Sequence, residues 1–259
     1  MSWLDADEIV LHPQRRLDCR VVALDDLTHD IRRIRLAIES GGPFAFSAGQ
    51  YASLAFKGMP PRDYSMANRP DDSVLEFHIR RMGAGSVSAH VADHLCLGDP
   101  VIAEGPFGSA YLREHHEGPI LAIAGGSGLA PIKAIVESAL ARGKRQPIHF
   151  YFGAGDERDV YLADHFAALA ARHDNFRFVP VLSAPRAATQ RRTGLVHEVV
   201  AADIDALDGA KAYLAGPPAM VEAATALLLH RLGLPPEDVH ADAFYTEADK
   251  AAQRAAPRL

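Results

Sequence analysis

Apolar and polar residues alternate with a period of two through the first part of the chain, between about residues 16 and 107. In the segments 33–38 and 75–80, for example, every second residue is a leucine, an isoleucine or a phenylalanine. Alternation of this kind predicts strands that bury one face. Turns rich in glycine, proline and aspartate separate these strands, and only residues 86–95 have a helical pattern. Many strands without intervening helices predict an antiparallel sheet or a small antiparallel β-barrel.

The pattern changes near residue 119, where continuous apolar strands begin to alternate with helical segments. This alternation predicts a doubly wound α/β domain, in which helices cover both faces of a parallel sheet. Sheets of this type bind ligands at the carboxyl ends of their strands. The expected strands are 120–124, 148–152, 176–182, 212–214 and 239–244, and the expected helices are 132–140, 159–172, 195–200 and 219–232.

The change of pattern divides the chain of 259 residues into two domains. A prior of about 150 residues for each domain agrees with this number. We place the barrel at residues 16–115 and the α/β domain at residues 116–245. Residues 1–15 form a separate N-terminal segment, and we expect residues 246–259, which are rich in alanine and charge, to form a frayed tail or a short helix.

Composition limits the classes of function. The sequence contains two cysteines, Cys19 and Cys96, which are too far apart to form a CxxC pair. A four-cysteine iron–sulfur cluster or a cysteine-rich zinc site is therefore excluded within this sequence. The net charge of −6 at pH 7 argues against a nucleic-acid partner. The acidic start lacks a signal-peptide pattern, and the apolar run 120–124 is too short to span a bilayer. We expect a cytoplasmic protein with no membrane association.

Two glycine-containing turns follow strands of the expected α/β domain and lead into helices. Residues 124–131 read Ala-Gly-Gly-Ser-Gly-Leu-Ala-Pro, and residues 214–220 read Leu-Ala-Gly-Pro-Pro-Ala-Met. Glycines let the backbone approach a phosphate closely, and a helix start offers free N–H groups to an anion. Because both turns end strands of one parallel sheet, we expect them to share a ligand-binding cleft.

Two short motifs stand out in the expected barrel. Residues 62–65 read Arg-Asp-Tyr-Ser, which combines a phosphate-pairing arginine with an aromatic ring and a hydroxyl. Residues 83–88 read Gly-Ala-Gly-Ser-Val-Ser and open the expected helix, so they form a further helix start suited to an anion. His90 and His94 have the spacing of a metal-binding pair, but no third ligand accompanies them, and we expect no metal site.

The order of these motifs resembles the ferredoxin–NADP reductase superfamily, and the resemblance extends over nearly the whole chain. Within that superfamily the sequence is most similar to the reductase components of bacterial ring-hydroxylating dioxygenases, of the naphthalene dioxygenase reductase type. Members of that type often begin with a plant-type iron–sulfur domain, which this sequence lacks, and residues 7–13 resemble the linker that would follow it. The superfamily motifs are residues 62–65, 85–88, 105–108, 125–131 and 216–218, and the closer match is carried by residues 7–13, 28–33 and 240–245.

The resemblance implies a flavin-binding barrel and a domain that binds a nicotinamide dinucleotide. In such proteins the residue that matches Arg62 pairs with the flavin pyrophosphate, which implies FAD rather than FMN. The residue that matches Tyr64 packs on the flavin, and the one that matches Ser65 hydrogen-bonds near its reactive N5 atom. Phe244 would cover the flavin where the nicotinamide enters. The implied catalytic residues are Tyr64, Ser65 and Phe244, and the implied cofactor-binding residues are Arg62, Tyr64, Ser65, His78, Ile79, Arg80, Gly85, Ser86, Val87, Ser88, Gly126, Ser127, Gly128, Ala130, Pro131, Gly216, Pro217, Pro218, Met220 and Phe244.

Two departures from the superfamily pattern bear on the dinucleotide. Ala215 stands where many relatives have a cysteine, so positioning rather than a thiol must support hydride transfer. Acidic residues at 156–157 follow the second parallel strand and suit the ribose 2′-hydroxyl of NADH. Arg186, Arg191 and Arg192 follow the third strand and could instead meet the 2′-phosphate of NADPH. We expect NADH to be favoured over NADPH.

These features predict an FAD-dependent oxidoreductase that moves electrons from NAD(P)H to a separate two-iron ferredoxin or oxygenase component. One alternative is an NAD(P)H:flavin reductase that uses flavin as a dissociable substrate. A purified protein that is colourless and turns over free FMN would favour it. The other alternative is a flavin-binding sensor or regulatory subunit without steady electron flux. Flavin that neither nicotinamide cofactor bleaches would favour that second alternative.

Overall fold

Alternation in the first part of the chain produces a six-stranded antiparallel sheet with the strand order β4-β3-β6-β1-β2-β5. Met66, directly after β4, forms an antiparallel bridge to Phe77 of β5. This bridge brings the two edge strands together, so the sheet is a nearly closed barrel. The computed structural model describes residues 9–246. Its barrel strands are β1 (Arg15–Asp26), β2 (Ile31–Ser40), β3 (Tyr51–Phe56), β4 (Arg62–Ser65), β5 (Leu75–Arg80) and β6 (Pro100–Phe107).

Strand β5 shows how the period of two is used. Leu75, Phe77 and Ile79 point into the barrel core. Successive residues of a strand point to opposite faces, so Glu76 and His78 lie on the outer face of the barrel. Both are nevertheless buried, because the second domain covers this face.

The helix of the barrel, α1 (Val87–Asp93), lies within the expected range 86–95. Ser86 is its N-cap, and the Ser86 side chain accepts a hydrogen bond from the backbone N–H of Ala89. Serine favours this position because its oxygen satisfies one of the free N–H groups at a helix start. The structure therefore confirms a helix that begins in the 83–88 motif.

The second part of the chain forms a parallel sheet with the strand order β10-β9-β8-β7-β11-β12. The order reverses between β7 and β11, which is the place where doubly wound sheets bind ligands. The fold class expected from the sequence is confirmed. The strands are β7 (Ile120–Gly125), β8 (Ile148–Ala154), β9 (Phe176–Leu182), β10 (Arg192–Thr193), β11 (Lys211–Gly216) and β12 (Val239–Ala243). The helices are α2 (Leu129–Ala141), α3 (Ala163–Ala170), α4 (Val196–Asp203) and α5 (Pro218–His230), with short 3-10 turns at Gly126–Gly128, Glu157–Asp159 and Pro236–Asp238.

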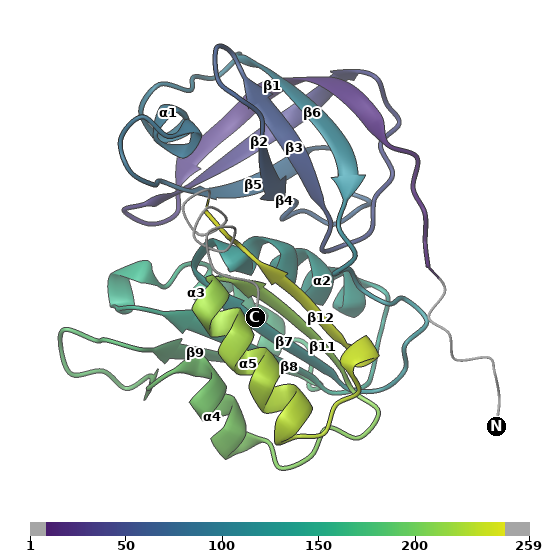
Figure 1. Ribbon diagram of the computed structural model, residues 1–259, viewed down its shortest axis with the longest axis vertical. Coiled ribbons are helices and arrows are strands. Elements are labelled where there is room, and N and C mark those ends of the chain that lie inside the picture. Colours follow the sequence, from purple (N-terminus) through teal and green to yellow (C-terminus); the bar gives the residue numbers. More distant parts are fainter. Residues whose placement is uncertain (1–8, 247–259) are drawn as a thin grey trace, which may run out of the picture.

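Helices cover both faces of the parallel sheet. α2 and α3 pack on one face, whereas α4 and α5 pack on the other. Figure 1 shows the barrel stacked on the α/β domain, with α2 between the barrel and the sheet. Three barrel-side residues, Ile31, Ala48 and Leu112, belong to the same apolar core as α2. The domain interface is therefore a packed hydrophobic contact that holds the barrel against α2.

One expected helix differs from the structure. The pattern predicts a helix over 159–172, but α3 begins only at Ala163. Leu162 adopts a left-handed conformation with φ 55°, which a continuous right-handed helix cannot contain. The two-residue strand β10 is too short to produce a periodic signal and is absent from the expected elements.

The expectation for residues 246–259 falls, apart from Thr246, outside the described residues, as does the start of the N-terminal segment. Within the described part of the chain, no helix has the length and apolar character that a membrane span requires.

Candidate functional site

The turns that follow β7 and β11 touch each other, as their common sheet edge predicts. A Cβ atom on Gly128 would overlap the carbonyl oxygen of Ala215, and a Cβ atom on Gly216 would lie 2.6 Å from the carbonyl oxygen of Gly125. Two backbones approach this closely only where a side chain is absent. Met220 packs over the same junction, because a Cβ atom on Gly125 would lie 2.5 Å from its Sδ atom.

Two helices begin at this junction without a side-chain cap. α2 follows the Gly126–Gly128 turn, with the buried Ala130 and Pro131 in its first helical turn, and α5 begins at Pro218 after Pro217. Neither N-cap makes a side-chain hydrogen bond to the helix. The positive ends of two helix dipoles therefore meet in one place, which is an environment that favours a pyrophosphate. Gly126 and Ser127 are partly exposed there.

Strand β4 carries the barrel side of the site. Its register places Ser65 opposite Tyr51 and Tyr64 opposite Ala52 on β3. Tyr64 packs against the barrel core and makes an edge contact with Phe56, with ring centroids 6.5 Å apart. Burial raises the pKa of Tyr64 to about 12, so the phenol stays protonated at neutral pH.

Ser65 joins the two domains. The Ser65 hydroxyl donates to Oδ2 of Asp242 on β12, with an Oγ–Oδ2 distance of 3.5 Å. Ser65 is buried, and burial also raises the pKa of Asp242, with the negative charge of Asp63 acting in the same direction against the hydrogen bond from Ser65. The chain thus places a hydroxyl and a carboxyl group of raised proton affinity side by side at the interface.

The residues around α1 and Arg62 fit a cofactor with a pyrophosphate. Within residues 9–246, the Arg62 guanidinium is exposed and bonds only to the carbonyl oxygen of its neighbour Pro61, at 2.9 Å. Cβ atoms on Gly83 and Gly85 would meet open space. An arginine without an acidic partner suits a phosphate, and a glycine loop that opens a helix leaves room for one. The Ser86 and Ser88 hydroxyls are already engaged, since they accept from the backbone N–H groups of Ala89 and Met82 respectively.

The strand residues His78, Ile79 and Arg80 have three different environments. Ile79 is part of the barrel core. The His78 side chain is fully buried at the domain interface, where its ring contacts Tyr161 with centroids 5.5 Å apart. Arg80 is exposed, and its Nε donates to Asp30 at 2.7 Å. Its Nη1 also lies beside the turn that follows β7, 3.5 Å from where a Cβ atom of Gly126 would be. Of the three, Arg80 reaches that turn directly, whereas His78 reaches it through the hydroxyl of Tyr161.

Phe244 follows β12 directly. Its backbone N–H donates to the carbonyl oxygen of Gly216 at 2.9 Å, and its ring packs against the core that contains α2. This hydrogen bond places Phe244 beside the second glycine turn. β4, the two glycine turns and the end of β12 therefore converge, and this region holds most of the expected site residues.

Three arginines after β9 are hydrogen-bonded to carboxylates, two of them to the acidic residues after β8. The backbone N–H of Arg186 donates to Oδ1 of Asp156 at 3.1 Å. Arg191 donates from Nε to Oε2 of Glu157 at 2.8 Å, and Arg192 donates to Asp203 at 2.8 Å. Hydrogen bonds from Thr189 and Arg191 lower the pKa of Glu157, which keeps it ionised. The positive charges in this loop are therefore neutralised by carboxylates of the chain itself.

Asp242 and Tyr161 have no role in the sequence prediction. Asp242 stands two positions before Phe244, so an ionisable residue near the end of the last parallel strand was the available signal. For Tyr161 no local signal exists, because its partner His78 is 83 positions away.

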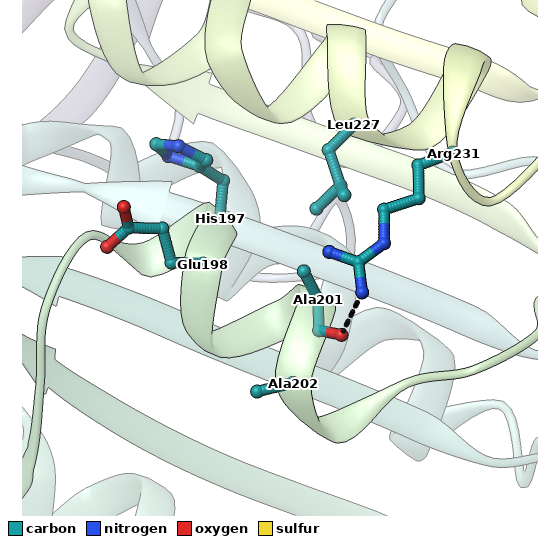
Figure 2. Close-up of a pocket in the computed structure, with 6 residues that line it drawn as sticks. All are labelled: His197, Glu198, Ala201, Ala202, Leu227 and Arg231. Carbon is teal, nitrogen blue, oxygen red and sulfur yellow. Dashed lines mark hydrogen bonds between the residues drawn. The ribbon is translucent and has the colours of Figure 1, made fainter.

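A hollow of about 260 Å³ lies elsewhere, between α4 and α5. Figure 2 shows its lining, with Arg231 reaching the carbonyl oxygen of Ala201. α4 and α5 cover the sheet face that is turned away from α2 and the barrel. None of the expected site residues lines this hollow, whose lining residues are His197, Glu198, Ala201, Ala202, Leu227 and Arg231.

Comparison with known proteins matches the barrel and the α/β domain to two different families. Residues 18–111 match the oxidoreductase FAD-binding domain family, and residues 122–226 match the oxidoreductase NAD-binding domain family. The ferredoxin–NAD(P)+ reductase component of the naphthalene 1,2-dioxygenase/salicylate 5-hydroxylase systems of Ralstonia sp. is 46% identical over 241 residues, which cover 93% of this chain and 73% of the relative. The corresponding naphthalene 1,2-dioxygenase component of Pseudomonas putida is 45% identical over 241 residues, with the same coverage of both chains.

Solved structures show the same fold. The crystal structure of the Amycolatopsis cytochrome P450 reductase GcoB superposes with a TM-score of 0.83 at 38% identity, covering 91% of this chain and 72% of that chain. The ferredoxin reductase of carbazole 1,9a-dioxygenase superposes with a TM-score of 0.82 at 30% identity, covering 92% of this chain and 71% of that chain. With the barrel, the parallel sheet and the convergent turns described above, these matches show that the chain belongs to the ferredoxin–NAD(P)+ reductase family of FAD- and NAD-binding oxidoreductases, together with the reductase components of naphthalene dioxygenase systems.

Proposed function

We propose that this protein moves electrons from NADH, through bound FAD, to a separate two-iron ferredoxin or oxygenase component. The observation that carries the proposal is the Ser65–Asp242 contact, which joins the expected flavin-contacting strand to the end of the dinucleotide-binding sheet. The names of the related proteins support the class of acceptor, because several of them are reductase components of oxygenase systems.

We assign the barrel residues 16–115 to FAD and residues 116–245 to the dinucleotide. Arg62 pairs with the pyrophosphate of FAD, and Tyr64 packs on the ring system. The backbone of 78–80 and the helix start at 85–88 hold the rest of the cofactor. Bound FAD supplies the redox chemistry, namely acceptance of a hydride and release of single electrons.

The chain contributes position and proton control. The turns 126–131 and 216–220 hold the dinucleotide at the positive ends of the helices that they open, and Phe244 covers the place where the nicotinamide enters. The Ser65 oxygen accepts a hydrogen bond near the reacting ring, since its own proton is directed to Asp242, which orients the hydroxyl. Ala215 leaves no thiol beside this position, so orientation carries the transfer.

The preference for NADH rests on the loop after β9. Asp156 and Glu157 engage Arg186 and Arg191, so these arginines are occupied before a dinucleotide arrives. A ribose 2′-phosphate would have to break these ion pairs and would then face the released carboxylates. A 2′-hydroxyl faces neither cost and can donate to a carboxylate.

Anaerobic mixing of the purified protein with NADH or NADPH, followed by candidate two-iron ferredoxins, tests the proposal. We expect flavin that copurifies with the protein to bleach faster with NADH, and a ferredoxin to be reduced faster than cytochrome c or free flavin. A colourless protein that turns over free flavin would support the dissociable-flavin alternative instead. Flavin that neither cofactor bleaches would support the sensor alternative and contradict both enzymatic functions.

A further inference from the structure

A row of buried polar groups crosses the domain interface beside the dinucleotide turn. On the outer face of β5, Nε2 of His78 lies 3.1 Å from Oε1 of Glu76. The other ring nitrogen, Nδ1, lies 3.3 Å from the hydroxyl oxygen of Tyr161, which is itself 3.3 Å from the carbonyl oxygen of Gly126. The row therefore connects a strand of the FAD-binding barrel to the backbone of the dinucleotide turn.

The Tyr161 hydroxyl carries one proton and has two groups that can accept it, Nδ1 of His78 and the carbonyl oxygen of Gly126. An ionised Glu76 accepts only, so Nε2 of His78 must carry a hydrogen to bond to it. In the neutral imidazole, Nδ1 is then an acceptor and takes the Tyr161 proton. In the imidazolium form both nitrogens donate, and the Tyr161 proton is free to bond to the Gly126 carbonyl. The protonation state of His78 thus decides which of the two groups receives the hydroxyl proton.

Charged groups from several elements surround the row. Arg35 on β2 donates to Oε2 of Glu76 at 2.7 Å, and Lys133 on α2 lies 3.5 Å from Oε1 of Glu76. Burial opposes the charge on Glu76, but the hydrogen bond from His78 and the charge of Lys133 outweigh it and hold the Glu76 pKa well below its usual range.

The other members of the row respond mainly to burial. Burial lowers the pKa of His78, as do the charges of Lys133 and Arg33, and Glu76 acts in the opposite direction. Burial, with the charges of Glu76 and Asp30, raises the pKa of Tyr161 far above its ordinary value. The hydroxyl proton therefore stays on Tyr161 and changes only its acceptor.

We propose that Tyr161 is a positioning residue for the dinucleotide, which bonds to the Gly126 carbonyl and orients the pyrophosphate-binding turn when His78 is protonated. This inference rests on the proposed function, because it assigns the turn at Gly126 to a dinucleotide. The imidazolium charge acts in the same direction, since it lies one hydrogen-bonded residue away from an anion site. Acidification strengthens dinucleotide binding, whereas at alkaline pH the Tyr161 hydroxyl donates to Nδ1 of the neutral His78 instead of to the Gly126 carbonyl.

Isothermal titration of the FAD-loaded protein with NAD+ tests this inference at about pH 4.5 and about pH 8, and the lower value is chosen because burial places the His78 pKa below the ordinary histidine value of about 6.5. We expect Tyr161→Phe to weaken NAD+ binding about 3- to 10-fold at the lower pH, the scale of one hydrogen bond, and less than about 2-fold at the higher pH. The matched control is Tyr151→Phe, which removes the hydroxyl of a buried tyrosine that donates to Asp203 at 3.2 Å, on the face away from the barrel.

Equal effects of Tyr161→Phe at the two pH values, or an affinity like that of Tyr151→Phe at both, would overturn the inference. His78→Gln gives a second test, because it removes the titrating group, and the NAD+ affinity should then lose its pH dependence. Retention of the wild-type pH dependence in His78→Gln would also overturn it. A wild-type protein that binds no NAD+ at either pH contradicts the proposed function itself, together with this inference.

Discussion

The hydroxyl of Ser65 and the carboxyl group of Asp242 face each other across the domain interface, 177 positions apart in the chain, with an Oγ–Oδ2 distance of 3.5 Å. Ser65 lies at the end of β4, and Asp242 lies near the end of β12. The pair joins the two halves of the proposed active site, and its contact depends on how the domains pack.

Replacement of Ser65 by alanine should slow the chemistry and spare the fold. We expect Ser65→Ala to reduce the rate of flavin reduction by NADH about 10-fold or more, the scale of one lost hydrogen bond to a reacting group. Stopped-flow measurement of flavin absorbance gives this rate. Ser73→Ala, in an exposed loop of the same barrel, is the control. An unchanged rate in Ser65→Ala would remove Ser65 from the mechanism.

Asp242 should make stability depend on pH. Because burial raises its pKa, the folded protein holds the Asp242 proton more tightly than the unfolded chain. The resulting stabilisation is present below the ordinary aspartate pKa of about 3.9 and is lost as the pH rises through the raised value. Asp242→Asn avoids this loss, so it should unfold at a higher temperature than the wild type at neutral pH. The difference should shrink in acid, and calorimetry at the two pH values measures it. A variant that is less stable than the wild type at neutral pH contradicts the prediction.

Arg62 should decide how tightly FAD is held. A charge-assisted bond to a pyrophosphate contributes about 1.5–3 kcal/mol, so Arg62→Ala should weaken FAD binding about 10- to 100-fold. Flavin content after dialysis, and titration of the apoprotein with FAD, measure the change. Arg172→Ala serves as the control, since Arg172 is exposed on the α/β domain and bonds to a carbonyl oxygen of α3. Full FAD occupancy of the Arg62→Ala protein after dialysis would refute the assigned role.

Release of the arginines after β9 should shift the cofactor preference. In the double variant Asp156→Ser with Glu157→Gln, Arg186 and Arg191 lose their carboxylate partners. We expect the kcat/KM ratio of NADPH to NADH to rise about 10-fold or more, since one arginine–phosphate bond contributes roughly 1.5 kcal/mol or more. Steady-state kinetics with both cofactors measure the ratio, with Asp174→Asn in an exposed turn as the control. A ratio that stays at the wild-type value would show that these arginines do not face the adenosine ribose.

Glu76 should stabilise the domain interface above acid pH. Its side chain is 5% exposed and contacts Arg35, His78 and Lys133. Because its pKa is lowered on folding, its contribution is present above the ordinary glutamate pKa of about 4.3 and is lost as the pH falls through the lowered value. Glu76→Gln removes a buried counter-charge from Lys133 and Arg35 and a buried hydrogen-bond acceptor from His78, and should cost about 3 kcal/mol at neutral pH.

Urea unfolding at neutral and acid pH measures this cost, which should shrink toward the acid side. Glu39→Gln is the matched control, because Glu39 pairs with Arg20 at an exposed site, where ion pairs contribute less than about 1 kcal/mol. Equal costs for the two substitutions would contradict the assigned burial effect.

The periodicity of residues along the chain was sufficient for the fold class. Alternation at 33–38 and 75–80 is a property of neighbouring residues, and it predicts strands whichever partner covers them. The turns after β7 and β11 were also readable, because glycine and proline report local backbone requirements. The order of the glycine and barrel motifs along the chain was enough to identify the family and the residues expected to contact the flavin on β4.

Packing between the domains decided what periodicity could not show. His78 follows the same alternation as any outward-facing strand residue, yet the α/β domain buries it against Tyr161, 83 positions away. Arg191 reads as a free cation in the sequence, and only the folded loop places Glu157 against it. Such contacts depend on the relative placement of distant segments, which depends on burying Ile31, Ala48 and Leu112 against α2 rather than on any short stretch of sequence. The elements and motifs were therefore determined locally, whereas the Ser65–Asp242 pair and the buried row at Tyr161 exist only because two hydrophobic surfaces meet.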